Sequence, residues 1–220
     1  MFSPSSVSLS EEEKKEESVY AGPEDHIDWS KFATENQIVI NDTQPALASV
    51  ELLRILLDEE MLVWDEAWRI VLEATTFTSH SMHARASEHW SVELLEKILP
   101  RHLDLIYLIN FYLIEHLKEI GVDEHKIANL SLVDESFPKS IRFGNLCFYS
   151  AHRSFGVTNL HVENLKRGLF SDLNEVYPSR LKVLSPTVCP VRWIYCANRP
   201  LTMALTESLG GDDSWLTDLR

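Results

Sequence analysis

The sequence is poor in cysteine and contains no long apolar run. Its three cysteines, Cys147, Cys189 and Cys196, show no paired spacing, which argues against a disulfide framework and fits free thiols in a reducing compartment. No stretch of 18 uncharged apolar residues occurs, so no membrane span is expected. The N-terminus has no apolar segment of the kind that secretory signals carry. These absences favour a cytoplasmic location.

Basic residues are also in short supply. The chain has 20 lysine and arginine residues against 34 aspartate and glutamate residues, and its formal net charge is -14. This balance argues against nucleic acid and against an anionic membrane surface as partners. The sequence shows no cluster of cysteine and histidine with metal-ligand spacing. The 220 residues, 45% of them apolar, suffice for one good core or two small domains.

The first residues differ in composition from the rest of the chain. Residues 1–33 are serine-rich and then strongly charged, with a run at Glu11–Glu17 that lacks apolar periodicity. This pattern predicts a disordered acidic lead, with a short solvated helix as the alternative. We expect Trp29 and Phe32 to attach the end of this lead to the body, which spans 34–220.

The body is expected to be α/β and predominantly helical. Apolar residues recur with helical spacing in most of it, a short apolar run at 38–40 suggests a strand, and weak alternation at 131–143 suggests a hairpin. The run at 145–151 fits strand or helix. In residues 101–120 the apolar stripe includes Leu105, Leu108, Ile109 and Tyr112, so we expect much of that helix to be buried. The expected helices are 47–57, 64–72, 92–99, 101–120, 124–130, 157–169 and one from about 191.

The stretch that follows the apolar run at 38–40 is the most informative one. Its sequence, NDTQP at 41–45, leads from an expected strand into an expected helix. Thr43 is predicted to cap that helix through its hydroxyl, and Pro45 suits a first helical turn. The junction between a strand and a helix is where α/β proteins place ligands, because free backbone N–H groups point outward there.

Several further motifs follow in a fixed order. They are WDEAW at 64–68, FTSHS at 77–81 with EHW at 88–90, LLEKILPRHL at 94–103, AH at 151–152 with GV at 156–157, and PVRW at 190–193. Together with NDTQP, these segments resemble the α-glucan (glycogen or starch) phosphorylase family of glycosyltransferases, in the order and near the spacings of that family. The resemblance covers about four fifths of the chain.

The resemblance implies a fold and a reaction. It implies part of the N-terminal Rossmann-like domain of a glycosyltransferase-B architecture, from the later part of that domain into the inter-domain connector. The family reaction is phosphorolysis of α-1,4-glucan to glucose 1-phosphate with pyridoxal phosphate as cofactor. The family's cofactor lysine has no counterpart in this chain, so no catalytic and no cofactor-binding residue is assigned, and we expect glucan or phosphate binding only if the missing domain is supplied.

The resemblance also assigns substrate-binding residues. In the family the loops that match 41–45 and 77–81 line the pocket beside the glucosyl unit, where short polar side chains are needed for directed hydrogen bonds. By carry-over these residues are Asp42, His80, Glu88, His152 and Gly156. Local alternatives exist for three of them: Asp42 could cap a helix, His80 could be a hydrogen-bonded loop residue, and Glu88 could be a solvated carboxylate.

The chain departs from the family pattern near the expected pocket. Gln44 stands where the family has histidine, Arg85 where it has glutamate, and Phe155 where it has asparagine. Pro186 and Thr187 replace an asparagine, described in the family as a sugar contact, and a glycine. A lost hydrogen bond to a buried polar group costs about 1–3 kcal/mol, so these changes predict weakened sugar binding.

Three hypotheses remain open at this point. The chain is a partial product of a phosphorylase-family gene, or a non-catalytic phosphorylase-like protein that acts through a protein partner or an oligomer, or a degenerate segment. Composition does not separate them.

Overall fold

The computed structural model describes residues 28–83, 88–184 and 188–218 of the chain. Most of the expected acidic lead, residues 1–27, lies outside the described residues. Helix α2 (Trp29–Glu35) starts inside the range 1–33 that was expected to be disordered. Trp29 lies against the body, where its indole Nε1 donates to the Glu60 carboxylate at 3.0 Å.

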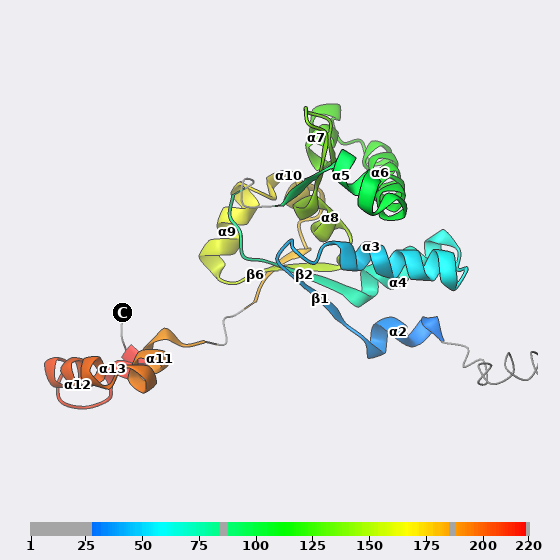
Figure 1. The fold of residues 1–220 in the computed structure, drawn as a ribbon. Coiled ribbons are helices and arrows are strands. Elements are labelled where there is room, and N and C mark those ends of the chain that lie inside the picture. Colours follow the sequence, from blue (N-terminus) through cyan, green and yellow to red (C-terminus); the bar gives the residue numbers. More distant parts are fainter. Residues whose placement is uncertain (1–27, 84–87, 185–187, 219–220) are drawn as a thin grey trace, which may run out of the picture.

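A four-stranded parallel sheet forms the centre of the body (Figure 1). Its strand order is β1-β2-β6-β7, and each neighbouring pair is parallel. These strands are β1 (Ile38–Asn41), β2 (Thr75–Ser79), β6 (Arg153–Gly156) and β7 (Leu181–Val183). A second, antiparallel sheet has the order β3-β5-β4 and consists of β3 (His89–Ser91), β5 (Ser140–Arg142) and β4 (Val133–Asp134).

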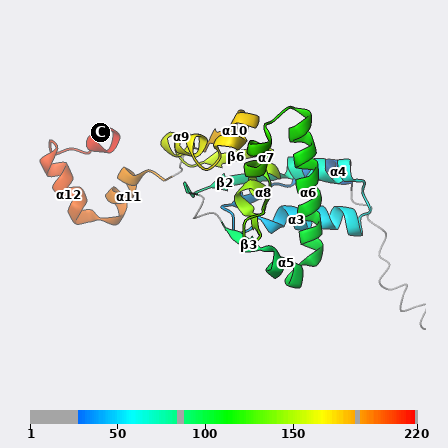
Figure 2. The ribbon, with the colours of Figure 1, turned by 90° about the horizontal axis from the view of Figure 1, so that it is seen from above.

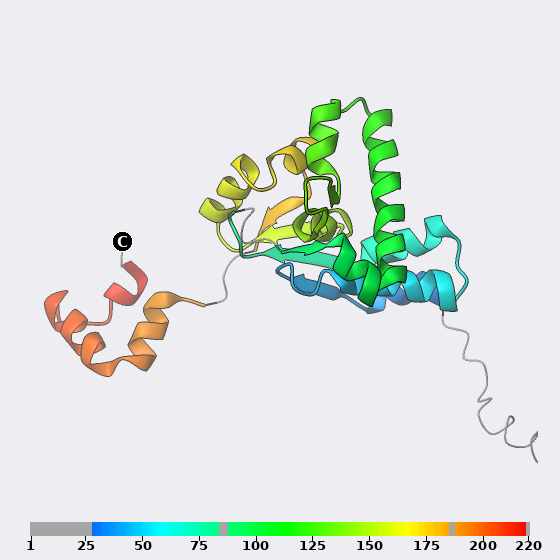
Figure 3. The ribbon, with the colours of Figure 1, turned by 45° about the horizontal axis from the view of Figure 1, so that its top comes forward.

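Helices cover the sheet and supply most of the core. Figures 1 and 3 show α6 and α7 on the same side of the sheet as α8, with α6 passing over α3 and α4. The π-helical turn η1 continues α3. The helices of the body are α3 (Leu47–Arg54), η1 (Ile55–Glu59), α4 (Trp64–Ala74), α5 (Val92–Ile98), α6 (Pro100–Glu119), α7 (Glu124–Leu130), α8 (Phe143–Tyr149), α9 (Asn159–Arg167) and α10 (Ser171–Val176).

The core lies between the parallel sheet and these helices. Phe77 of β2 is fully buried, as the middle strand of a covered parallel sheet requires. Its ring meets Phe170 edge-on at a centroid distance of 6.1 Å, and Phe170 contacts Phe148 of α8 at 5.4 Å. This aromatic group joins the sheet to α8 and to the turn before α10, and burial of each ring contributes roughly 1.5–3 kcal/mol.

The last part of the chain forms its own small group of helices. They are α11 (Pro190–Ala197), α12 (Arg199–Ser208) and α13 (Trp215–Asp218), drawn in orange and red in Figures 1 and 2. Trp215 is 3% exposed and donates from Nε1 to Thr206 Oγ1 at 2.9 Å. Gly210 and Gly211 adopt positive φ angles of 122° and 80°, and Gly211 N donates to Thr206 O, so these two glycines end α12.

Most of the expected helices are present, and the hairpin is confirmed as β4 and β5. The ambiguous run at 145–151 is mostly helical, as part of α8. Two details were wrong. Thr43 does not cap α3, because the helix begins at Leu47 after Ala46 and has no side-chain cap. The expected burial of α6 fails at Leu108 and Tyr112, which are exposed although Leu105 and Ile109 are buried.

Candidate functional site

Polar loops meet at the carboxyl edge of the parallel sheet. Asn41 of β1 pairs with Thr78 of β2, and Ser79 of β2 pairs with Gly156 of β6, so the loops after all three strands leave the sheet side by side. Ligands in α/β proteins bind at this edge because strand ends and loops converge there. Four of the five predicted site residues lie at this edge: Gly156 ends β6, and Asp42, His80 and Glu88 lie in the segments that follow β1 and β2.

Asp42 is the residue most constrained by its backbone. Its φ angle is 62°, in the left-handed region that aspartate tolerates better than most residues. Its N–H donates to Thr78 O at 2.8 Å, while its carboxylate accepts from Thr43 N at 3.0 Å and from Ser81 Oγ at 3.3 Å. Asp42 therefore holds the loop after β1 to the loop after β2, and does not cap a helix.

His80 projects from the loop after β2 and is exposed. Its Nε2 lies 2.6 Å from Asn41 Oδ1. Because a side-chain amide oxygen only accepts, Nε2 carries the hydrogen and Nδ1 of the neutral ring is left as an acceptor. Asn41 thus fixes the ring beside Asp42 with one nitrogen free for a donor such as a hydroxyl group.

Glu88 contributes a buried carboxylate oxygen. Its backbone N–H donates to Thr43 Oγ1 at 3.4 Å. The Thr43 hydroxyl therefore binds the segment before β3 and does not cap α3 as expected. Its Oε2 is buried and has no hydrogen-bond partner among the described residues. An unpaired buried acceptor is costly, so this oxygen is suited to accept a hydrogen bond from a bound group.

Cys147 of α8 lies behind these carboxylates. Burial raises the pKa of the Cys147 thiol far above its ordinary value, and the negative charges of Asp42 and Glu88 raise it further. The thiol therefore stays protonated at neutral pH and is unsuited to act as a nucleophile. Both carboxylates therefore lie near enough to Cys147 to act on it electrostatically.

Gly156 serves the site through packing. A Cβ at this position would lie 2.6 Å from Val162 Cγ2 and 3.2 Å from His161 Nδ1, so only glycine lets α9 approach the end of β6. His161 of α9, which was not among the predicted site residues, is buried. Its Nδ1 accepts from Val157 N at 3.2 Å and its Nε2 faces Ser81 O at 3.4 Å. It links α9 to the loop that carries His80, and no sequence motif pointed to it.

His152 lies at the opposite edge of the sheet, and the structure corrects its grouping with the other four residues. It precedes β6, next to Thr75 at the start of β2. Its Nδ1 lies 3.1 Å from Leu72 O and 2.9 Å from Thr75 O, and its backbone N contacts the same two carbonyls. Parallel strands place the residue before β6 a full strand length from the residue after β1, so His152 fastens α4 and β2 to β6.

The carboxyl edge offers hydrogen-bond acceptors from Asp42, Glu88 and His80 together with the Ser81 hydroxyl. Such a set suits a neutral ligand with many hydroxyl groups. Within the described ranges no three histidine, cysteine or acidic residues are placed to hold a metal ion. None of the described helices is long and apolar enough to cross a membrane.

The chain thus has an α/β fold with a parallel sheet, and polar loops gather at the sheet edge where α/β proteins commonly bind ligands. The chain belongs to the carbohydrate phosphorylase family, whose family model matches residues 17–220. It is 36% identical over 193 residues to alpha-glucan phosphorylase 2, cytosolic, of Arabidopsis thaliana, a match covering 87% of this chain and 23% of that protein.

Other relatives give the same picture. Glycogen phosphorylase, brain form, of Bos taurus is 35% identical over 192 residues, covering 87% of this chain and 22% of the relative. The alpha-glucan phosphorylase H isozyme of Vicia faba is 34% identical over 193 residues, a match that covers 87% of this chain and 23% of that protein. The chain thus spans less than a quarter of the length of these relatives.

Proposed function

We propose that these residues form the glucosyl-facing wall of an α-glucan phosphorylase site, whose reaction is phosphorolysis of α-1,4-glucan to glucose 1-phosphate. The observation that supports this most is the cluster in which Asp42 is held by Ser81 while Asn41 orients His80. Every side chain in it comes from the two loops that carry the NDTQP and FTSHS motifs. In this proposal the sheet belongs to the Rossmann-like N-terminal domain of a glycosyltransferase-B architecture.

In this proposal His80 and Asp42 bind and orient the sugar and do not transfer protons. The free Nδ1 of His80 accepts from a glucosyl hydroxyl, and the unpartnered Glu88 Oε2 accepts from another donor. Directed hydrogen bonds of this kind give a polar ligand its orientation. Gln44, which is exposed in the turn before α3, and the half-buried Phe155 of β6 are the departures that weaken binding.

Pyridoxal phosphate, the cofactor of the family, does not fit the residues gathered here. A phosphate group is bound by cations or by clustered N–H donors, whereas Asp42 and Glu88 present carboxylates. The family's cofactor lysine has no counterpart in the sequence. We therefore propose that this segment supplies sugar contacts only and that it works in the cytoplasm, in keeping with the word "cytosolic" in the name of the Arabidopsis relative.

A chimera tests this proposal. The matched 193-residue segment of the Arabidopsis relative is replaced by the corresponding residues of this chain, and phosphorolysis is measured with and without the reversions Gln44→His and Phe155→Asn. We expect weak activity that the reversions raise at least about tenfold, equivalent to about 1.4 kcal/mol. Asp42→Ala and His80→Ala should then remove most of that gain.

A chimera that misfolds would not end the test, because sugar binding is also measurable on the chain itself. Stable glucan binding is expected only with the missing domain, but saturation-transfer NMR detects weak contacts. The chain carrying Gln44→His and Phe155→Asn should show such contacts with maltopentaose and should lose them when Asp42→Ala is added. Equal signals with and without Asp42 would overturn the proposed site.

A further inference from the structure

The segments that connect the parallel strands cover only one face of the sheet. The strands follow one another in chain order, β1-β2-β6-β7, so every crossover moves to the next position in the same direction. Crossovers between parallel strands are almost always right-handed, which places all the connecting helices on the same face. Ile40, Phe77 and Leu181 point to that face and are at most 3% exposed.

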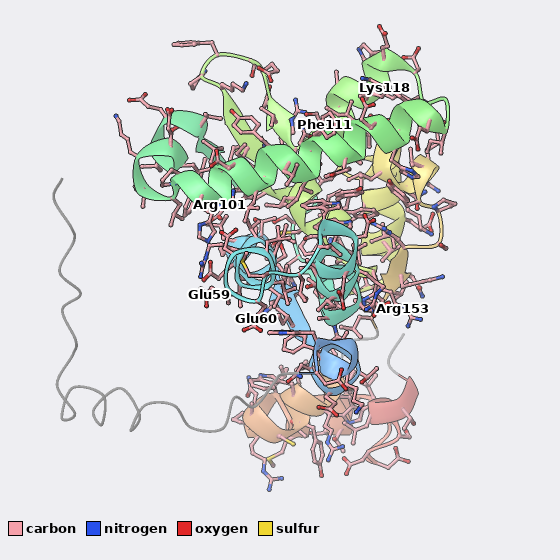
Figure 4. The ribbon with its side chains drawn as sticks, turned by 90° about the vertical axis from the view of Figure 1, so that its right-hand side faces the viewer. Glu59, Glu60, Arg101, Phe111, Lys118 and Arg153 are labelled. Atoms are coloured by element: carbon pink, nitrogen blue, oxygen red, sulfur yellow. The ribbon has the colours of Figure 1, made fainter. Side chains whose placement is uncertain are left out.

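The alternate residues of the same strands form the second face, which we call the outer face. The register places Val39 beside Thr76 and Thr76 beside Arg153, and it places Phe155 beside Lys182. Val39 is 58% exposed, and both cationic side chains are exposed. Figure 4 shows Arg153 on the side of the sheet that faces away from α6. Parallel sheets are usually buried on both faces, so the outer face is suited to contact a further segment.

Arg153 and Lys182 give the outer face a positive charge. They lie on neighbouring strands, and Arg153 is two positions before the register partner of Lys182. Among the described residues neither side chain makes an ion pair or a hydrogen bond. The chain as a whole has a net charge of -14, so its own acidic segments are a source of complementary charge.

Residues 1–27 contain the most acidic run of the chain. They hold seven acidic and two basic residues, with five of the acidic ones in Glu11–Glu17, and Val19 and Tyr20 follow that run. The helix after them, α2, ends three residues before β1 begins, at the same end of the sheet where β6 starts with Arg153. The eleven residues from Glu17 to Asp28 span up to about 36 Å. This reach exceeds the length of α2, about 10 Å, plus the width of four strands, about 14 Å.

We propose that residues 11–20 dock on the outer face of the chain's own sheet. The glutamates of Glu11–Glu17 lie against Arg153 and Lys182, and the two apolar residues that follow cover the exposed Val39. A tethered segment has a high effective concentration, so weak contacts suffice to hold it. Exposed ion pairs are screened by salt, so the contact is reversible and salt-dependent. It needs neither glucan nor any residue of the candidate site, and therefore does not depend on the proposed function.

A spin label on the full chain tests this docking. Ser10→Cys carries the label in a chain with Cys189→Ser and Cys196→Ser, because these two cysteines are exposed whereas Cys147 is buried. At low salt the label should broaden the NMR amide signals of β6 and β7 and leave those of α6 sharp. In about 0.5 M salt most of the broadening should disappear, since charges are then screened over a few ångströms.

Charge reversal tests which residues receive the segment. Arg153→Glu combined with Lys182→Glu should weaken docking at least about tenfold. Lys118→Glu combined with Arg167→Glu is the matched control, because it changes the net charge equally on helices of the covered face, and it should keep the broadening. If the reversed chain does not fold, as its NMR spectrum shows directly, Arg153→Gln with Lys182→Gln replaces it and should also weaken docking.

A mixed sample separates docking within one chain from contact between chains. It combines spin-labelled chain without isotope and unlabelled chain enriched in ¹⁵N, and its signals should stay sharp. Broadening in this mixture overturns the proposal. So does the absence of broadening at β6 and β7 in the labelled chain, or equal broadening in the charge-reversed chain and the wild type.

Discussion

The two edges of the parallel sheet hold histidines of opposite character. At the amino edge His152 is tied by ring and backbone to Leu72 O and Thr75 O, with Nδ1 contacts of 3.1 and 2.9 Å. At the carboxyl edge His80 is exposed and makes one contact, to Asn41 Oδ1 at 2.6 Å. The first histidine closes a junction between elements, while the second leaves a ring nitrogen available to a ligand.

The surroundings repeat this contrast. The carboxyl edge contains the left-handed Asp42 and the unpartnered Glu88 Oε2, which are features that folding alone does not favour. The same residue type therefore stabilises the fold at one edge and is free to bind at the other. Strand direction decides which role it takes, because ligand loops follow the ends of parallel strands.

The largest expected effect is the absence of catalysis, which tests whether the residues at the carboxyl edge are sufficient for the family reaction. The 220-residue chain alone should release no glucose 1-phosphate from glycogen and phosphate above a heat-inactivated control. It should also form no Schiff base with pyridoxal phosphate, since the family's cofactor lysine has no counterpart here. A stoichiometric absorbance band from the bound cofactor that a competing amine removes, or sustained phosphorolysis, would contradict this.

The next prediction compares the two histidines directly. His152→Ala should lower the free energy of unfolding by about 1–2 kcal/mol, because Leu72 O and Thr75 O lose the ring donor at a part-buried junction and keep only the backbone N–H. His80→Ala, at an exposed position, should change it by less than about 0.5 kcal/mol. Urea unfolding followed by tryptophan fluorescence measures both. Equal losses in the two variants would break the contrast between the edges.

A third prediction concerns the close approach of α9 to β6. Gly156→Ala should lower the free energy of unfolding by about 1–3 kcal/mol, because the new methyl meets Val162 Cγ2 at 2.6 Å. Combining it with Val162→Ala should recover part of the loss by making room. Calorimetric melts of the two variants measure the difference. An unchanged Gly156→Ala melt would show that α9 can move away at no cost.

The sequence predicted local elements better than their assembly. The helices of 64–72 and 101–120 follow from apolar spacing, which is a local property. Strand β2 was missed because Thr75–Ser79 has no polar alternation, and all five residues are buried in the middle of the sheet. The sequence did not show which apolar residues of α6 are exposed, such as Leu108 and Tyr112, because periodicity locates apolar residues but not what covers them.

The sequence predicted only those parts of the candidate site that lie in recognisable motifs. NDTQP and FTSHS located Asp42 and His80 because both loops follow strands. His152 was grouped with them because it stands only four positions before Gly156. Strand β6 runs between the two residues, so they lie at opposite edges of the sheet. His161 has no signal in the motifs, since its role depends on Ser81, 80 residues earlier in the chain.

The last prediction concerns Cys147, the buried thiol behind Asp42 and Glu88. Because the folded state raises its pKa above the ordinary value of 9.0, the folded chain keeps this proton when the unfolded chain loses it. The resulting penalty is absent below pH 9.0 and grows as pH rises above it, by up to about 1.4 kcal/mol per pH unit.

Cys147→Ala should therefore flatten the decline in unfolding free energy between about pH 9 and pH 10, whatever its effect at neutral pH. Cys196→Ala, at an exposed cysteine, is the matched control and should leave the slope unchanged. Urea titrations at several pH values measure the slope for each chain. A decline of equal steepness in the wild type and in Cys147→Ala would mean that burial in the folded chain does not hold this thiol neutral.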